Sequence, residues 1–156
     1  MTDQNSVVVA IALGSNLGDR ARTLDAAVAA IRRLLTDVEV STYHDTEPVG
    51  VPAPQPRYLN AALVGRTNRP PAELLAGLQA IEESMGRTRP FANAPRTLDL
   101  DLILYGTLKV ESPALTVPHA RFRERRFVLE PLAEIAPELR DPETGATVAA
   151  LLARLS

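Results

Sequence analysis

The sequence predicts an α+β fold with a ferredoxin-like βαββαβ core, in which helices pack on a mainly antiparallel sheet. Three observations support this prediction. Four short stretches are rich in β-branched or alternating apolar residues, which is typical of strands. Two longer stretches carry apolar residues at helical spacing, after the first and the third strand. With 46% hydrophobic and 23% charged residues, the chain suits one folded domain over residues 1–156.

The first half of the chain supplies three of these strands and one helix. Residues 7–13 are apolar and rich in β-branched side chains, so they predict a buried strand. Asp19 is placed to cap a helix over residues 20–35, where apolar side chains recur at helical spacing. The next two strands are predicted over residues 38–43 and 59–67.

Two loops and a second helix follow in the middle of the chain. Four prolines within residues 45–58 preclude a helix and indicate a stiff loop, which is either functional or a surface connector. Residues 72–85 predict the second helix, which Gly86 ends, and residues 86–95 form a second loop. After the fourth strand, short closing helices are predicted over residues 127–135 and 148–155.

The fourth strand holds the most informative pattern in the chain. Asp99 and Asp101 alternate with apolar residues and therefore share one strand face, with their Cα atoms roughly 6.5–7 Å apart. The opposite face is predicted to carry an apolar row of Leu98, Leu100, Leu102 and Leu104. Because like charges this close repel, a compensating cation is expected, and Mg²⁺ prefers carboxylate and phosphate oxygens. The alternative is an exposed strand with acidic residues on its wet face.

Charge is distributed unevenly along the chain. The net charge is −2, which argues against a general nucleic-acid binder. Residues 87–126 hold eight basic and four acidic residues, a net charge of +4, so the remainder carries −6. A basic cluster around two carboxylates suits a small polyanion bound with a metal ion better than a long nucleic acid.

Composition also excludes some classes of site. The chain has no cysteine, which excludes disulfides and thiolate zinc sites. The N-terminal residues lack a positively charged leader, and the apolar run over residues 7–13 is too short to cross a membrane. We therefore expect a cytoplasmic protein that acts on small molecules, with neither nucleic acid nor membrane as a partner.

Paired carboxylates with several arginines are the parts that phosphoryl transfer needs. Metal ions bridge phosphate oxygens there, and arginine binds phosphate through a planar fork that stays charged. The aspartates could instead form an acid/base pair. Two further alternatives are a metal-dependent nucleotidyl transferase or nuclease, and a non-enzymatic ferredoxin-like ligand-binding module. Residues 14–18 lack the ending of a phosphate loop and are interpreted as a strand-to-helix turn.

Five blocks then point to a family. In chain order they are Ala12-Leu13-Gly14-Ser15-Asn16-Leu17-Gly18-Asp19, Tyr58-Leu59-Asn60-Ala61-Ala62, Pro95-Arg96-Thr97-Leu98-Asp99-Leu100-Asp101-Leu102, Leu115-Thr116-Val117-Pro118-His119 and Glu130-Pro131-Leu132-Ala133-Glu134-Ile135-Ala136-Pro137. With these blocks the chain resembles the 6-hydroxymethyl-7,8-dihydropterin pyrophosphokinase family. The resemblance implies an enzyme of folate biosynthesis that transfers pyrophosphate from ATP to the hydroxymethyl group of the pterin and releases AMP.

The resemblance also implies roles for individual residues. Asp99 and Asp101 match ligands of two Mg²⁺ ions, and together with Arg87 and Arg96 they are the expected catalytic residues. The expected pterin-binding residues are Thr46, Val49, Gly50, Tyr58, Asn60 and Phe127. The expected ATP-binding residues are Gln79, Glu82, Arg87, Arg89, Arg96, Leu102, Thr116, His119 and Arg125. We expect a monomer whose ligands are ATP and the pterin substrate.

Two positions depart from the family pattern. The family commonly has Arg-Trp-Gly-Pro-Arg in the second loop, where this chain has Ala92-Asn93-Ala94-Pro95-Arg96. The tryptophan that usually closes over the pterin is therefore absent, and we hypothesise that Phe91 replaces it. Ala120 stands where a tyrosine is common, which removes an expected contact with adenosine.

Overall fold

The centre of the molecule is an antiparallel sheet. The structure, a computed structural model, describes residues 6–16, 19–46, 58–86 and 98–155. The strands stand in the order β2-β4-β1-β5, and β3 also pairs with β4. Their bounds are β1 (Val7–Ser15), β2 (Thr36–Val40), β3 (His44–Thr46), β4 (Tyr58–Thr67) and β5 (Asp99–Tyr105). All pairings are antiparallel, so the predicted ferredoxin-like core is confirmed.

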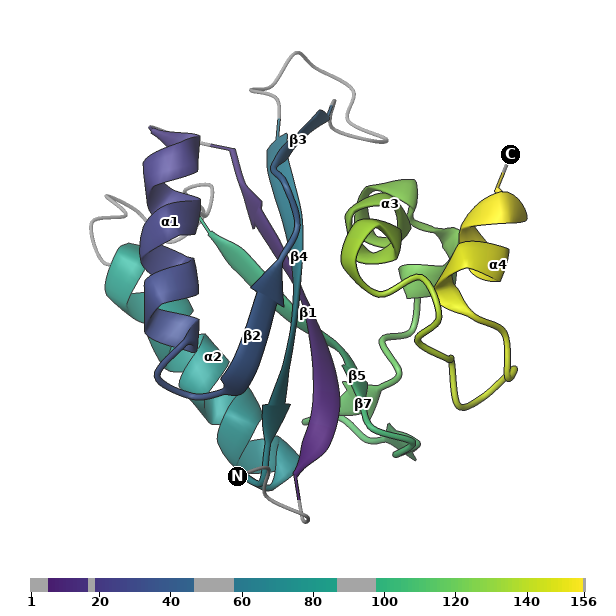
Figure 1. Cartoon of the computed structure of the whole chain (residues 1–156). Coiled ribbons are helices and arrows are strands. Elements are labelled where there is room, and N and C mark those ends of the chain that lie inside the picture. Colours follow the sequence, from purple (N-terminus) through teal and green to yellow (C-terminus); the bar gives the residue numbers. More distant parts are fainter. Residues whose placement is uncertain (1–5, 17–18, 47–57, 87–97, 156) are drawn as a thin grey trace.

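Helices cover both faces of this sheet (Figure 1). The helices α1 (Arg20–Ile31) and α2 (Pro71–Gly86) lie on one face, and α3 (Arg126–Ile135) and α4 (Val148–Ala153) lie on the other. Each face therefore has its own apolar core. Leu24, Ile31, Leu63, Leu74 and Leu78 are buried on the first face, and Ala62, Ile103, Phe122, Leu129 and Leu132 on the second. In the part of the chain that the structure describes, no helix is long and apolar enough to cross a membrane.

The first helix is shorter than predicted. The side chain of Asp19 accepts a hydrogen bond from the Arg22 amide at 3.2 Å, which confirms the predicted cap. The helix ends at Ile31 rather than near residue 35. The amides of Arg33 and Leu34 bond to carbonyls three residues back, which tightens the chain into a turn before β2.

The single strand predicted over residues 38–43 is divided into β2 and β3. Ser41 lies between them, and its amide donates to the Ala62 carbonyl at 2.9 Å. Its hydroxyl accepts from the Ala62 amide at 2.9 Å. The side chain of Ser41 thus replaces a backbone partner at this point, and the strand resumes as β3 beside Asn60.

A bulge in β5 overturns one prediction for the aspartate strand. Ile11 of β1 lies opposite Leu102, whereas the preceding Ala10 lies opposite Leu104, so Ile103 is an extra residue in β5. The bulge places Leu104 on the face toward α3, not in the predicted row with Leu98, Leu100 and Leu102. Asp99 and Asp101 precede the bulge, so their shared face is unaffected.

The segment after β5 carries the chain from the sheet to α3. A two-stranded ribbon of β6 (Val110–Glu111) and β7 (Thr116–Val117) is followed by the short 3₁₀ helix η1 (Phe122–Glu124). Arg123 of η1 binds the fully buried Asp141 through two hydrogen bonds of 2.5 and 2.9 Å. This pair joins η1 to the turn that precedes α4.

Candidate active site

A cavity of about 410 Å³ opens on the α3 side of the sheet, and its floor is made by small residues of β1. Gly14 lies between Asp99 of β5 and Asn60 of β4, and the alternating position Ala12 lies next to Asp101. Residues 12 and 14 share one strand face. Because neither has a side chain longer than a methyl group, the middle of the sheet is left hollow between the side chains of β4 and β5.

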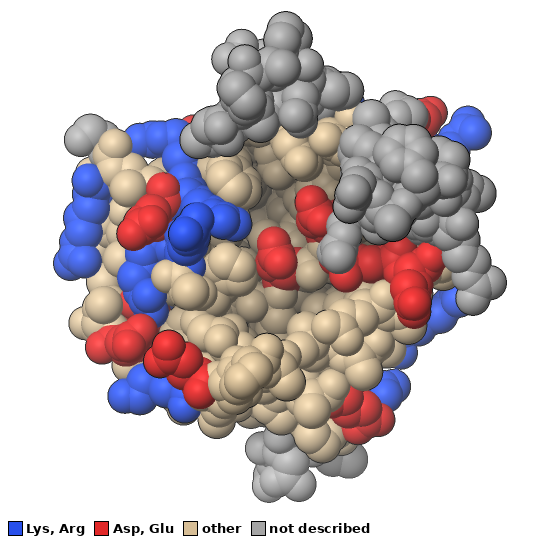
Figure 2. Space-filling model, turned by 180° about the vertical axis from the view of Figure 1, so that it is seen from behind, with Lys and Arg blue, Asp and Glu red and all other residues tan. Residues whose placement is uncertain are grey.

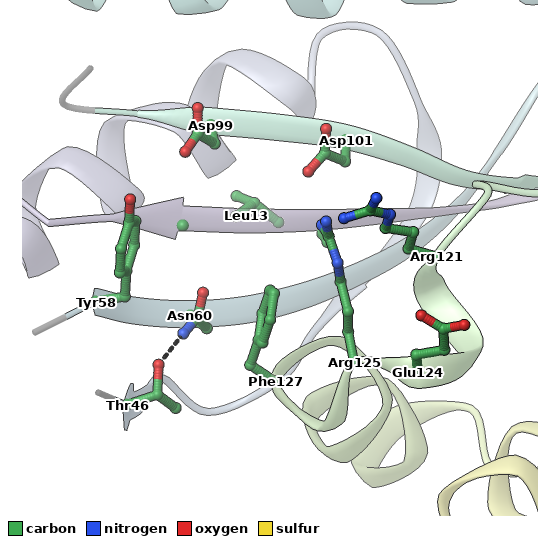
Figure 3. A pocket seen from close by; sticks show the side chains of 12 residues that line it. Leu13, Thr46, Tyr58, Asn60, Asp99, Asp101, Arg121, Glu124, Arg125 and Phe127 are labelled. Atoms are coloured by element: carbon green, nitrogen blue, oxygen red, sulfur yellow. Dashed lines mark hydrogen bonds between the residues drawn. The ribbon is translucent and has the colours of Figure 1, made fainter. Parts of the chain in front are cut away.

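Asp99 and Asp101 line this cavity together, as the alternation predicted (Figure 3). Both side chains are partly exposed to it. Within the described ranges, no cluster of three or more His, Cys, Asp or Glu side chains could hold a metal ion. Two carboxylates are fewer ligands than a cation such as Mg²⁺ takes, so a cation held here would need further ligands from water or from an oxygen-rich substrate.

Cations form one wall beside Asp101. Arg121 and Arg125 extend from the segment around η1 into the cavity on the side of Asp101 (Figure 3). Neither forms an ion pair with another described residue. The space-filling view shows acidic side chains in the hollow with basic side chains to one side of them (Figure 2). Two guanidinium groups that are directed into one cavity, and have no carboxylate partner in the described part of the chain, form a suitable binding surface for a polyanion.

His119 does not line the cavity, but it is hydrogen-bonded to the backbone of Arg121, which does. Its amide donates to the Ile103 carbonyl at 2.9 Å, and its Nδ1 accepts from the Arg121 amide at 3.2 Å. In the neutral ring the proton is therefore on Nε2. Burial lowers the pKa of His119 and the charges of Arg125 and Arg121 lower it further, while Asp101 opposes them. The ring is consequently neutral at pH 7.

The opposite end of the cavity is less charged and partly aromatic. Tyr58, Asn60 and Phe127 line it, and the Asn60 amide donates a hydrogen bond to the Thr46 hydroxyl. Asn60 is only 6% exposed, so its remaining carbonyl oxygen is a specific acceptor rather than a solvated group. Burial and the charge of Asp99 raise the pKa of Tyr58, which keeps its hydroxyl protonated. This end combines flat apolar surface with oriented hydrogen-bonding groups, as a planar heterocycle requires.

Comparison with known proteins agrees with this geometry. The model of the 7,8-dihydro-6-hydroxymethylpterin-pyrophosphokinase (HPPK) family matches residues 10–137. This chain belongs to the HPPK family. It is 45% identical over 137 residues to the 2-amino-4-hydroxy-6-hydroxymethyldihydropteridine pyrophosphokinase of Pseudomonas aeruginosa, covering 86% of this chain and 84% of that protein. It is 44% identical over 138 residues to the protein of the same name from Bacillus subtilis, covering 87% and 82%.

A solved structure supports the HPPK fold. The wild-type HPPK-DHPS of Plasmodium falciparum superposes with a TM-score of 0.75 at 13% identity. The match covers 96% of this chain and 44% of that longer chain. At this identity the likeness concerns the fold alone, and it agrees with the antiparallel sheet and packed helices described above.

Several of the residues predicted from the HPPK resemblance do not line the cavity. Gln79 is exposed on α2, and the carboxylate of Glu82 accepts a hydrogen bond from the Leu100 amide at 2.7 Å. Leu102 is 4% exposed in the core on the α1–α2 side of the sheet. Thr116 lies on β7, where its hydroxyl is 3.4 Å from the Ser112 carbonyl. Their roles toward ATP stay predictions.

Other HPPK predictions fall outside the described residues. These are Val49 and Gly50 in the first loop and Arg87, Arg89, Phe91 and Arg96 in the second. The described cavity nevertheless brings together predicted residues from four separate strands and helices. They are Thr46, Tyr58, Asn60, Asp99, Asp101, Arg125 and Phe127.

Sequence reasoning missed five residues that line the HPPK cavity, namely Ala12, Leu13, Gly14, Arg121 and Glu124. Gly14 was assigned to a structural turn, yet it is part of β1 and of the cavity floor. Arg121 and Glu124 also line the cavity, from a segment with no helical or strand periodicity. The one available signal for Arg121 was its place in the basic stretch 87–126. That signal did not separate it from the other arginines there.

Proposed function

We propose that this chain transfers the pyrophosphoryl group of ATP to the hydroxymethyl group of 6-hydroxymethyl-7,8-dihydropterin, releasing AMP. The observation that carries this proposal is that different parts of one cavity are lined by different kinds of side chain. Two carboxylates lie along one side, hydrogen-bonding and aromatic side chains at one end, and at the other two guanidinium groups that form no ion pair with the described residues (Figure 3). A reaction between a planar heterocycle and a polyphosphate needs these surfaces side by side.

The carboxylate pair fits Mg²⁺ bound together with ATP. Mg²⁺ in such sites keeps water and phosphate ligands and takes one or two carboxylates from the protein. Asp99 and Asp101 would hold it, and we propose two ions at this pair. When bound, Mg²⁺ neutralises phosphate charge and lowers the pKa of an oxygen that coordinates it. Two carboxylates on one strand face repel each other, and a bound cation would relieve that repulsion.

The pterin is proposed to lie at the end of Tyr58, Asn60 and Phe127. The Asn60 amide is held by Thr46, which leaves the Asn60 carbonyl as an acceptor and the Thr46 hydroxyl as a donor. A pterin ring carries amino and ring N–H donors with neighbouring acceptors on one edge. Phe127 offers an aromatic face, and Arg125 lies over that ring at 5.6 Å from its centroid.

The triphosphate is proposed to lie between the aspartates and the cationic wall. Arg121 and Arg125 each contribute a bidentate donor fork. His119 is not among the residues that line the cavity, and we keep it as a further candidate N–H donor because its ring is neutral. Charge develops on the phosphate oxygens as the hydroxyl attacks in line with the departing AMP oxygen. Fixed cations at this wall stabilise that charge more in the transition state than in bound ATP.

The direct test is to identify the products. The protein is incubated with ATP, Mg²⁺ and 6-hydroxymethyl-7,8-dihydropterin, and products are separated by chromatography. Formation of AMP and pterin diphosphate in equal amounts, abolished by EDTA and restored by excess Mg²⁺, supports the proposal. Release of inorganic pyrophosphate would instead indicate nucleotidyl transfer, and ATP binding without turnover would indicate a ligand-binding module.

We further propose that the chain acts as a single domain and a monomer. The cavity is formed within one chain, from β1, β3, β4, β5 and α3 together with the segment around η1. A molar mass near 16.8 kDa by light scattering, with full activity in the same fraction, supports this. Activity confined to a dimeric fraction would contradict it.

A further inference from the structure

The segment of residues 42–46, which contains β3, lies between the two helical layers and contacts both. Its odd-numbered side chains reach α1. The Tyr43 hydroxyl donates to Asp25 at 2.6 Å, and Arg20 pairs with Asp45 at 3.2 Å. Its even-numbered positions face the α3 side, because side chains alternate along an extended segment.

Glu134 of α3 is the partner on that second side. Its carboxylate accepts a hydrogen bond from the Thr42 amide at 2.8 Å and from the Thr42 hydroxyl at 2.7 Å. The same carboxylate lies 3.2 Å from Nε2 of His44. Hydrogen bonds from the amide and hydroxyl of Thr42 lower the pKa of Glu134, so the group is charged at neutral pH. A single carboxylate thus holds two successive even-numbered positions of the segment.

The third even-numbered position is Thr46, the partner of Asn60 at the pterin end of the cavity. β3 is only three residues long, and its described backbone pairing is with β4. Such a short edge strand is weakly fixed by its backbone hydrogen bonds alone. The place of the Thr46 hydroxyl therefore depends on the side-chain contacts that hold Thr42 and His44.

We propose that Glu134 is a positioning residue for pterin recognition. Through Thr42 and His44 it fixes β3, and so orients the Thr46–Asn60 pair, without contacting the substrate. The proposal rests on the proposed function for the identity of the ligand. It gives a role to the block 130–137, which lies outside the cavity lining and which neither the metal site nor the phosphate wall uses.

The test compares Glu134→Gln with Glu130→Gln. Glu130 lies one turn earlier on α3, is exposed, and has no hydrogen bond or ion pair with the described residues, so it is a matched control. In Glu134→Gln we expect the KM for the pterin to rise about tenfold, as for loss of a charge-assisted contact, with the KM for ATP within about twofold of wild type. Glu130→Gln should match wild type in both constants.

A merely structural role predicts a different pattern. If Glu134 only holds α3 against the sheet, Glu134→Gln lowers the melting temperature and either leaves the KM for the pterin unchanged or raises the KM for both substrates equally. Either result overturns the proposal. If the glutamine variant fails to fold, Thr42→Val removes the hydroxyl that donates to Glu134 and keeps the amide hydrogen bond, whereas Thr42→Ser keeps both donors. The proposal requires a raised pterin KM in the valine variant and rescue by serine.

A second readout does not depend on the ligand. The side-chain amide of Asn60 gives a pair of signals in ¹⁵N-correlated NMR spectra of the free protein. We expect Glu134→Gln to shift these signals or speed their hydrogen exchange, and Glu130→Gln to leave them in place. Unchanged Asn60 signals overturn the positioning role even if the enzyme acts on another substrate. A wild-type chain that yields no pterin diphosphate overturns the proposed function and leaves this readout decisive for Glu134.

Discussion

Gly14 and Asn60 lie opposite each other in β1 and β4, and they approach so closely that a Cβ atom on Gly14 would be 3.1 Å from Oδ1 of Asn60. The same glycine lies opposite Asp99 on its other side. The absence of a side chain at residue 14 therefore sets the position of the Asn60 amide and the depth of the cavity between it and the carboxylates.

Gly14→Ala should weaken pterin binding selectively. The new methyl group displaces the Asn60 side chain by a few tenths of an ångström, and overpacking of this kind costs about 1 kcal/mol or more. We expect the KM for the pterin to rise about fivefold to tenfold, with a smaller effect on ATP. Steady-state kinetics with each substrate varied in turn measures this. Equal loss for both substrates would show that Gly14 serves the sheet rather than the cavity.

The aspartates should be separable from fold stability. Asp101→Asn and Asp99→Asn each remove one ligand charge, so turnover at saturating ATP should fall about 100-fold or more, equivalent to ~3 kcal/mol of transition-state stabilisation. Removal of the Asp101 charge, which lies close to that of Asp99, should leave the free energy of unfolding unchanged or higher. Turnover measured against Mg²⁺ concentration, together with denaturant unfolding, checks both parts. Wild-type turnover in either variant contradicts the proposed metal site.

Arg121 should act on ATP although sequence reasoning did not select it. Arg121→Ala removes a cation from the wall, and the KM for ATP should rise about tenfold, with the pterin KM little changed. Arg126→Ala is the control, because Arg126 is exposed at the start of α3 and does not line the cavity. Isothermal titration with a non-hydrolysable ATP analogue and Mg²⁺ measures the binding directly. Equal affinity in the two variants would exclude Arg121 from the phosphate site.

Asp141 should make the free energy of unfolding depend on pH in the acidic range. Burial alone would raise the pKa of Asp141, but hydrogen bonds from Arg123, Thr144 and the Glu143 amide outweigh it and lower the pKa to about 2, below the ordinary 3.8. The group therefore contributes stability that is fully present above pH 4 and is lost as pH falls toward 2, on the order of 2 kcal/mol.

Asp141→Asn tests this linkage against a neighbouring carboxylate. The variant should be less stable than wild type at pH 7, and the difference should shrink as pH falls from 4 to 2. Glu143→Gln is the control, since the Glu143 side chain is 62% exposed and its pair with Arg123 should contribute little. Urea unfolding at several pH values measures both. A difference between Asp141→Asn and wild type that is constant with pH would contradict the assignment.

The regular parts of the fold could be predicted because their periodicity is local. The alternation around Asp99 and Asp101 placed both carboxylates on one face, and the helical spacing placed α1 and α2 to within a few residues. The bulge at Ile103 could not be predicted, since it arises from the pairing of β5 with β1. The break at Ser41 likewise depends on Ala62, twenty-one residues away.

The site was predicted only in part. Asn60, Tyr58 and Phe127 were selected from the family resemblance, and the structure brings them to one end of a cavity. Arg121 lies in an irregular segment, where its direction is set by the chain around η1 and not by any repeating pattern. Gly14 contributes to the site because it has no side chain, and this contribution is evident only from the register between β1 and β4.

The central claim is that the paired carboxylates serve transfer of pyrophosphate to the pterin. ATP carrying an isotopic label in its β-phosphate tests this most directly, with Mg²⁺, the pterin substrate and either wild type or Asp101→Asn. We expect the label to move into pterin diphosphate with wild type, to leave AMP unlabelled, and to stay in ATP with the variant. Label recovered in free inorganic pyrophosphate, or transfer by the variant at the wild-type rate, would contradict the account.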